Sequence, residues 1–338
     1  MHILSKKLRI LSTIIAMLAT TLSTVPALAA PELLRLPEGI TVSSSEFLPL
    51  DTTGNQNYPE AQITARQAQI LYPFGLASHM AHSYKLNRSN PIDHHWNFDR
   101  LNFLELTPLD TQLIPTTTFE LFNPKTGRFE HEASGLQARG LLHKPSNTLI
   151  LGFAGTDFDL GQRSRATLYS STLIAWNYQN PMLNEAAQLC QQLLESDQYD
   201  QIILTGSSLG GAVAQYAAIA CDLPVVAFNS LALSKELRTN AINFGAQMTY
   251  ELDKTLEEHR DNLILAKIKG EFLNNNKWLG GYALQNPHPV GVPSYIIPPA
   301  NNKLNMLKRH WTPAVVAGLE KMAGYHFPLW TKERKQEL

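Results

Sequence analysis

The chain has 338 residues, which is long enough for one large α/β domain or two ordinary ones. Apolar residues make up 44% of it and charged residues 17%, a composition that is typical of globular proteins and excludes a disordered or fibrous chain. The formal net charge of −1 gives no reason to expect nucleic acid or an anionic membrane as an obligatory partner.

Residues 1–29 have the three parts of a secretory signal peptide. The basic stretch 6–9 precedes an apolar run that starts at Ile10, and the small residues of 27–29 form a cleavage site. The alternative, a membrane anchor, is disfavoured because serines and threonines interrupt the apolar run before it reaches the ~20 residues of a bilayer span. We therefore expect cleavage after Ala29 and export, to a periplasm or to the outside.

Residues 30–114 are expected to form an N-terminal arm and a helical segment that packs on the main domain. The arm is rich in turn formers, and apolar residues at helical spacing predict a helix over 64–84. This helix carries His79 and His82, and the Asp-His-His segment 93–95 follows it. These side chains are candidate metal ligands, but they match no known ligand pattern. We therefore favour ordinary polar or core histidines and expect no metal.

The remainder, residues 115–338, is expected to form one α/β domain. Short extended runs over 115–153 are separated by turn formers, which predicts antiparallel hairpins. Predicted helices and strands then alternate, which indicates a parallel sheet covered by helices. The helix over 180–197 has Asn180 as its cap, and a short apolar strand over 201–205 follows it.

The two cysteines, Cys190 and Cys221, fall in predicted helices on either side of that strand. A disulfide between them and two separate buried thiols are both compatible with an exported protein that has a large core. Neither cysteine lies in a pattern typical of a nucleophile or a metal ligand.

The strand over 201–205 leads directly into a glycine-rich turn and then a helix. Gly206, Ser208 and Gly210 form the pattern G-x-S-x-G, which by itself is common. Between a strand and a helix it predicts a nucleophile elbow, a sharp turn that needs its glycines and exposes the serine hydroxyl above the sheet. The amino terminus of the following helix favours negative charge at that hydroxyl.

The stretch ILTGSSLGGAVA (203–214) resembles the elbow of the class 3 lipases, whose usual form is T-G-H-S-L-G-G-A, and LILGFAGTD (149–157) resembles their F-R-G-T segment. The resemblance extends over about 115–320. It implies an α/β-hydrolase fold, with a mostly parallel central sheet and helices on both faces, and hydrolysis of lipid esters without a cofactor. Ser207 stands where the family has histidine and Ala154 where it has arginine, so the resemblance is to a distant member.

The resemblance assigns Thr156 to the oxyanion hole by its backbone amide, with its hydroxyl as a further candidate donor, together with the amide of Leu209. Residue chemistry agrees, because a strand that ends at Gly155 can bring a donor beside the elbow, and ester hydrolysis passes through an oxyanion. The alternative is a glycine-containing strand exit without a role in catalysis.

A serine nucleophile needs a base, and the base needs an orienting acid, which follow in this fold in the order Ser, Asp or Glu, His. For the base we favour His310, immediately before a predicted helix; the other histidines after the elbow are His259, His288 and His326. For the acid we favour Glu271, at the carboxyl end of the strand over 262–270, where open parallel sheets place their active sites. The family usually has aspartate there, and the alternatives are Asp222, Asp253 and Asp261.

The substrate is predicted from segment 158–180, which occupies the place of the family's lid. Its apolar side chains are candidates either for lining an acyl groove or for packing on the sheet: Leu168, Tyr169, Leu173, Ile174 and Trp176. We expect a lipid ester as substrate and transient contact with a lipid interface. Three rival interpretations are a catalytically inactive relative that binds lipid or protein, a serine peptidase or thioesterase, and an envelope protein that acts through 30–114.

Overall fold

The computed structural model describes most of the chain between residues 60 and 327. The described residues are 60–82, 99–109, 121–123, 127–156, 162–175, 178–249, 263–271, 273, 294–302, 304 and 306–327. The predicted signal peptide, the arm as far as residue 59, the segment 93–95 and the predicted domain boundary after residue 114 lie outside them.

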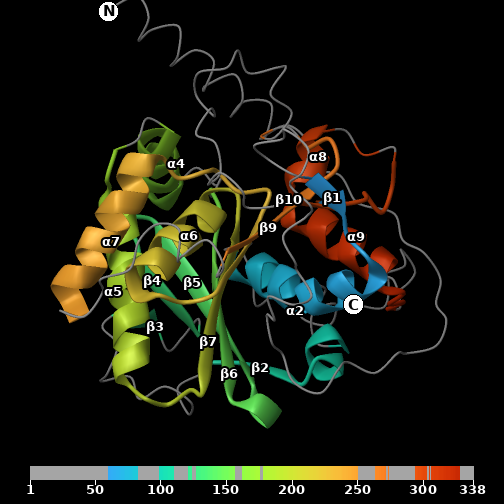
Figure 1. Cartoon of the computed structure of the whole chain (residues 1–338), viewed down its shortest axis with the longest axis horizontal. Coiled ribbons are helices and arrows are strands. Elements are labelled where there is room, and N and C mark those ends of the chain that lie inside the picture. Colours follow the sequence, from blue (N-terminus) through green and yellow to red (C-terminus); the bar gives the residue numbers. More distant parts are fainter. Residues whose placement is uncertain are drawn as a thin grey trace, which may run out of the picture.

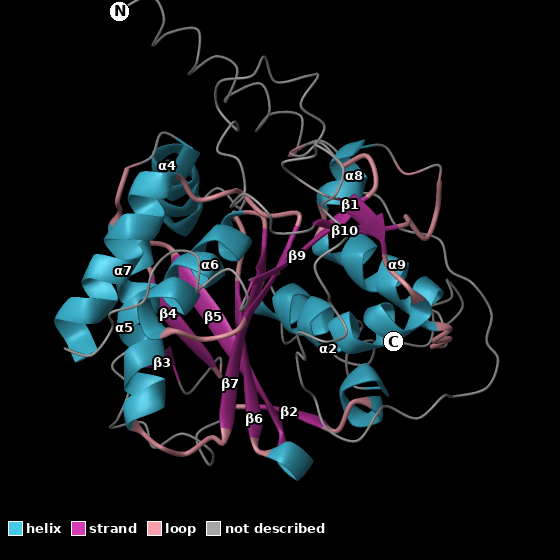
Figure 2. Cartoon of the chain, in the orientation of Figure 1, coloured by secondary structure: helices cyan, strands magenta, loops and turns pink. Residues whose placement is uncertain are grey.

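A single mixed sheet forms the centre of the described molecule (Figures 1 and 2). Its strands are β1 (Glu60–Gln62), β2 (Leu106–Pro108), β3 (Phe122–Asn123), β4 (Arg128–His131), β5 (Leu136–His143), β6 (Thr148–Phe153), β7 (Gln201–Ser207), β8 (Val225–Phe228), β9 (Leu263–Ile268) and β10 (Ser294–Ile297). The order is β1-β10-β9-β8-β7-β6-β5-β4-β3, with β2 paired to β5. The six strands from β1 to β6 in this order run parallel, and the β5, β4 and β3 hairpins are antiparallel, as predicted.

Helices cover both faces of this sheet. They are α2 (Ala65–Ala81), α4 (Gln162–Ala175), α5 (Pro181–Glu195), α6 (Leu209–Cys221), α7 (Lys235–Thr249), α8 (Met306–His310) and α9 (Thr312–Ala323). Figure 1 shows α5, α6 and α7 on one side of the sheet, and α2 and α9 on the other. Helices α4 and α5 lie between β6 and β7 in the chain, α6 between β7 and β8, and α7 between β8 and β9, as the alternating pattern predicts.

Each face of the sheet has its own hydrophobic core because neighbouring residues of a strand point to opposite faces. In β6, Leu149 and Leu151 pack with α5 and α6, whereas Ile150 packs with α2 and α9. In β7, Leu204 and Ile203 divide in the same way. These central strands are buried on both sides, which explains their continuously apolar sequences.

Local sequence signals account for the residues at which α5 and α2 begin. α5 begins after Asn180, whose Oδ1 accepts a hydrogen bond from the Leu183 amide at 3.3 Å. α2 begins after Thr64, which forms a capping box with Gln67, and it continues past Pro73 to Ala81. The helix expected over 64–84 is therefore confirmed within a few residues at each end.

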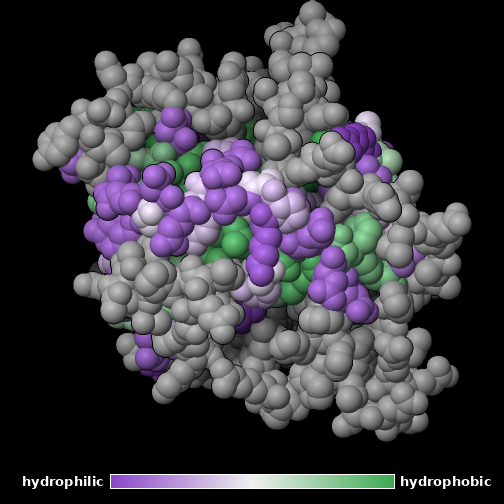
Figure 3. Space-filling model, turned by 90° about the horizontal axis from the view of Figure 1, so that it is seen from below, coloured by the Kyte–Doolittle hydropathy of each residue, from purple (hydrophilic) through white to green (hydrophobic). Residues whose placement is uncertain are grey.

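The described surface has a hydrophilic region at the amino ends of the parallel strands. Figure 3 views the molecule from below, and purple side chains gather across the middle of this face with only small green areas between them. None of the helices in the described part of the chain is long and apolar enough to cross a bilayer. The candidate site lies at the opposite, carboxyl end of the parallel strands.

Candidate active site

Ser208 lies at the junction of β7 and α6, in the strained backbone conformation that the elbow motif predicts. Its φ is 58° and its ψ is −124°, a region that residues with a side chain seldom adopt. The turn after β8 stabilises this conformation: the Ser208 amide donates to the Phe228 carbonyl at 3.1 Å, and the Leu231 amide donates to the Ser208 carbonyl at 3.2 Å. The half-buried Ser208 is therefore fixed at the carboxyl edge of the sheet.

The glycines around Ser208 are required by close backbone contacts. A Cβ on Gly206 would lie 2.2 Å from the Gly210 carbonyl oxygen, and a Cβ on Gly210 would lie 2.2 Å from the Phe153 carbonyl oxygen. Backbone atoms cannot move aside as a flexible side chain can. Glycine at these two positions therefore allows the backbone to pack closely within the elbow and against the end of β6.

His310 and Glu271 are in direct contact, although 39 residues separate them. The His310 Nδ1 lies 2.7 Å from the Glu271 Oε2, and both side chains are buried, with 8% and 0% exposed. The Leu273 amide donates to the same Oε2 at 3.0 Å and so fixes the carboxylate. This contact at Nδ1 orients the imidazole.

Asn229, which the sequence analysis did not predict as a site residue, follows β8 and forms hydrogen bonds to β9 and to α8, the helix that carries His310. It is fully buried with a φ of 42°, and its Nδ2 donates to the carbonyls of Arg309 at 3.2 Å and His310 at 3.1 Å. Its Oδ1 accepts from the Ile268 amide at 2.8 Å. The available signal was an amide side chain directly after the apolar run of β8, because a polar group there must find partners inside the protein.

The turn that contains Asn229 also contacts the elbow. Its neighbours Phe228 and Leu231 make the backbone hydrogen bonds to Ser208 described above. One turn therefore contacts Ser208 on one side and the backbone of His310 on the other. The structure brings Glu271 and His310 together beside the elbow, while His259 and His288 lie outside the described residues, and His326 Nδ1 contacts the Gly324 carbonyl.

The two predicted oxyanion donors come equally far after paired positions of two adjacent strands. Phe153 of β6 pairs with Gly206 of β7, and the third residue after each is Thr156 and Leu209. Among the described residues, neither the Thr156 amide nor the Leu209 amide has a hydrogen-bond acceptor. Two N–H groups at one sheet edge without an acceptor among the described residues suit an oxyanion hole, and their catalytic role remains a prediction.

His79 and His82 have different partners. The His79 Nδ1 contacts the Thr312 Oγ1 at 3.0 Å, and the His82 Nε2 accepts from the Gly155 amide at 3.4 Å. Burial is the largest cause that lowers the pKa of His79 to about 3. Within the described ranges, no three His, Cys, Asp or Glu side chains are grouped to hold a metal ion.

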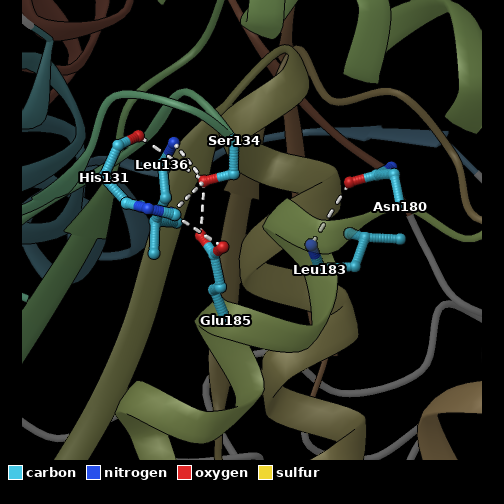
Figure 4. Close-up of polar contacts among 6 residues, drawn as sticks. All are labelled: His131, Ser134, Leu136, Asn180, Leu183 and Glu185. Atoms are coloured by element: carbon cyan, nitrogen blue, oxygen red, sulfur yellow. Dashed lines mark hydrogen bonds and ion pairs between the residues drawn. The ribbon is translucent and has the colours of Figure 1, made fainter.

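A second group of serine, histidine and glutamate lies where the β4–β5 turn meets α5 (Figure 4). Glu185 of α5 accepts from Ser134 with one oxygen, and its other oxygen lies 2.8 Å from the His131 Nδ1. The Ser134 Oγ lies 3.3 Å from that same Nδ1. In a catalytic triad the serine and the acid use different imidazole nitrogens, so this group instead connects the β4–β5 turn to α5.

The α4 side chains that were candidates for a groove differ in their surroundings. Ile174 is fully buried in the core beside α5 and α6, whereas Tyr169 is 63% exposed. Leu168 and Leu173 are half-buried, and Trp176 lies outside the described residues. At least Ile174 therefore packs on the sheet side of α4.

Both cysteines are free thiols at the α5–α6 contact. The Cys221 Sγ lies 3.5 Å from the Ala187 carbonyl oxygen, one turn before Cys190. Burial and the neighbouring Cys221 raise the pKa of the Cys190 thiol well above its usual value. The Cys190 thiol is therefore not suited to nucleophilic chemistry, because a thiolate is the reactive form.

The topology and the elbow together define the class of fold. The parallel strands β6, β7 and β8, the strained serine between β7 and α6, and an acid and a histidine delivered by later segments are the arrangement of an α/β-hydrolase. The predicted α/β-hydrolase fold is confirmed.

Comparisons with known proteins found similarity in structure but none in sequence. No family model and no curated protein matches the chain. The Lip2 lipase of Yarrowia lipolytica is similar in structure, with a TM-score of 0.38 and 12% identity over 70% of this chain and 82% of that one. A propeptide complex of the Rhizomucor miehei lipase has a TM-score of 0.41 and 11% identity, over 80% and 83% of the two chains. Both of these proteins are lipases.

Proposed function

We propose that the chain is an exported serine hydrolase that cleaves carboxylic esters of lipids through Ser208, His310 and Glu271. The observation that carries the proposal is the buried contact of 2.7 Å between Glu271 and His310 beside a strained serine elbow. A buried carboxylate on Nδ1 stabilises the imidazolium that forms during proton transfer. A purely structural role for all three groups would not require the strain at Ser208.

The reaction divides into acylation and deacylation. His310 Nε2 takes the proton of the Ser208 hydroxyl as its oxygen attacks the ester carbonyl, and the amides of Thr156 and Leu209 bind the oxyanion that develops. His310 then gives that proton to the leaving alcohol, and an acyl-enzyme remains. Water, deprotonated by His310, hydrolyses the acyl-enzyme by the same route, and this chemistry needs no cofactor.

The class of substrate and the location rest on sequence features. The resemblance of 203–214 and 149–157 to class 3 lipases supports a lipid ester, and the basic and apolar parts of residues 1–29 support export. The exposed Tyr169 of α4 is a side chain that suits transient contact with a lipid interface.

A second candidate function is a catalytically inactive member that binds lipid or protein. It is favoured by three departures from the family pattern: Ser207 in place of histidine, Ala154 in place of arginine and Glu271 in place of aspartate. In that case the fold would persist without a working nucleophile.

The experiment is labelling of the purified exported protein with a fluorophosphonate probe, which reacts with an activated serine whatever the natural substrate. We expect labelling of the wild type, its loss in Ser208→Ala, and labelling at least ~100-fold slower in His310→Gln. Ser134→Ala is the matched control, because Ser134 belongs to the other Ser–His–Glu group and its loss should leave labelling unchanged.

A folded wild type that stays unlabelled, with and without detergent, would favour the inactive member. If labelling succeeds, rates on p-nitrophenyl esters of increasing acyl length, compared with matched thioester and peptide substrates, test the substrate class. Faster cleavage of the thioester or the peptide than of every ester would contradict the lipid-ester assignment.

A further inference from the structure

Each of the three residues after β6 has a different hydrogen-bond partner, two through the backbone amide and one through the side chain. The Ala154 amide donates to the Gln137 carbonyl at 2.9 Å and the Gly155 amide to the His82 Nε2 at 3.4 Å. The Thr156 Oγ1 lies 2.8 Å from the Ser171 Oγ. Of these three amides, that of Thr156 alone is left without an acceptor among the described residues.

The direction of the Thr156–Ser171 hydrogen bond follows from counting protons. The Ser171 Oγ donates to the Thr167 carbonyl at 2.9 Å, and a hydroxyl has one proton. Ser171 must therefore accept, and the Thr156 hydroxyl must donate to it. The Thr156 hydroxyl proton points to α4, so the amide is the donor that Thr156 has available for an oxyanion.

His82 contacts the same segment from the other face of the sheet. Its backbone is fixed by Arg128, whose Nη2 donates to the His82 carbonyl at 3.3 Å. Its ring lies against Gly155, where a Cβ would be 2.8 Å from the His82 Cε1 and 2.9 Å from the Ser207 carbonyl oxygen. Because its Nε2 accepts the Gly155 amide, that nitrogen carries no proton.

We propose that His82 and Ser171 are positioning residues that set the Thr156 amide for oxyanion binding. The inference rests on the proposed hydrolase function and extends it to two side chains, from the residue that caps the end of α2 and from α4, that do not touch the substrate. The strand pairing of β6 with β7 ends at Phe153, so it no longer fixes residues 154–156. A displacement of about 1 Å at such a donor costs on the order of 100-fold in rate.

The first test compares Ser171→Ala with Thr172→Val. Thr172 is the matched control because its hydroxyl also donates within α4, to the Leu168 carbonyl at 2.9 Å. We expect Ser171→Ala to lower kcat for a p-nitrophenyl ester about tenfold with KM within about twofold, since the lost interaction acts in the transition state. Thr172→Val should leave both constants unchanged.

A double-mutant cycle tests whether Ser171 acts through the Thr156 hydroxyl. Thr156→Val keeps the amide and removes the hydroxyl, so Thr156→Val, Ser171→Ala and the double variant should lose about the same kcat. Additive losses, or a far greater loss in Thr156→Val than in Ser171→Ala, would overturn the assignment of the hydroxyl to Ser171.

The second test uses two substitutions of His82. His82→Phe keeps a ring against Gly155 and removes the acceptor, and it should lower kcat about tenfold. His82→Gln places an amide oxygen near the former Nε2 and should restore most of that loss. If the two variants have equal kcat, His82 does not act through the Gly155 amide.

Hydrogen–deuterium exchange of the peptide that contains residues 153–156 gives a readout that needs no turnover. Exchange should be faster in Ser171→Ala and His82→Phe than in the wild type, and unchanged in Thr172→Val. A labelled wild type whose exchange and kcat are unaffected by Ser171→Ala and His82→Phe overturns the positioning roles alone. A wild type without fluorophosphonate labelling overturns the proposed function, and the catalytic purpose of these contacts with it.

Discussion

Individual residues at the candidate site combine strain with buried charge. Ser208 has a positive φ without being a glycine, and Glu271 is a carboxyl group with no exposed surface. A buried acid needs partners, and Glu271 has the His310 ring and the Leu273 amide. Both features cost stability, and such features are enriched at functional sites, which is why they point to a candidate site here.

At the residue scale, we predict that Glu271→Gln lowers kcat by about 10³- to 10⁴-fold, because an amide offers the His310 Nδ1 either the wrong tautomer or no stabilising charge. Glu271→Asp keeps the charge on a shorter side chain and should lose only about tenfold. Steady-state rates on an ester that labelling has validated give the measurement, and unchanged thermal unfolding serves as the control. Equal rates in the two variants would show that the charge of Glu271 does not matter.

Among the elements, the strand–turn–helix unit of β7 and α6 is the most tightly determined. Its glycines face backbone atoms of the same turn and of β6, so the unit depends on tertiary contact as well as on local conformation. The adjoining strand β8 adds the hydrogen bonds that support Ser208. The elbow is therefore a property of three neighbouring strands and one helix.

At the element scale, we predict that Gly206→Ala destabilises the fold by about 3 kcal/mol, since its Cβ would meet backbone atoms at 2.2 and 2.4 Å. Gly324→Ala is the comparison: its φ is +74°, but nothing lies within 4 Å of a Cβ there, so only about 1 kcal/mol of backbone strain is expected. Urea unfolding measures both. A smaller loss for Gly206→Ala than for Gly324→Ala would contradict the close packing at the elbow.

Across the whole molecule, helices from the two ends of the described chain close one face of the sheet together. α2 packs against α9, and the buried Arg100 forms an ion pair of 2.6 Å with the half-buried Glu320 of α9. The Tyr72 hydroxyl donates to the same Glu320 at 2.6 Å. The contact between His79 of α2 and Thr312 of α9 lies at this junction too. Protonation of His79 should therefore affect the packing of α2 against α9.

At this scale, we predict an acid-dependent loss of stability through His79. Its pKa is about 3 in the folded protein against 6.5 when unfolded, so the unfolded chain gains a proton first as the pH falls. Above pH 6.5 His79 therefore does not lower the free energy of unfolding. Between pH 6.5 and 3 this free energy falls by about 1 kcal/mol per pH unit.

The measurement is the free energy of unfolding from pH 8 to pH 4.5 for the wild type and His79→Gln, which keeps a polar partner for Thr312. The difference between the two proteins should shift in favour of His79→Gln as the pH falls below 6.5. Parallel curves over this range would show that the His79 ring is free to take up a proton in the folded state.

The sequence by itself determined the elements from α5 to β8 and the motif of the elbow, because their signals are local. Helical spacing, the Asn180 cap and the apolar run of β7 involve residues within a few positions of each other, and so does the pattern around Ser208. The α/β class followed from the alternation of such elements.

Only the tertiary structure decided which distant side chains meet. Glu271 and His310 are 39 residues apart, Asn229 and His310 are 81 apart, and His82 and Gly155 are 73 apart. No local pattern specifies such pairs, since a hydrogen bond depends on distances that exist only once the strands are ordered in the sheet. The sequence therefore allowed several acids and histidines, and the crossing of the chain at the carboxyl edge of the sheet selected one buried pair.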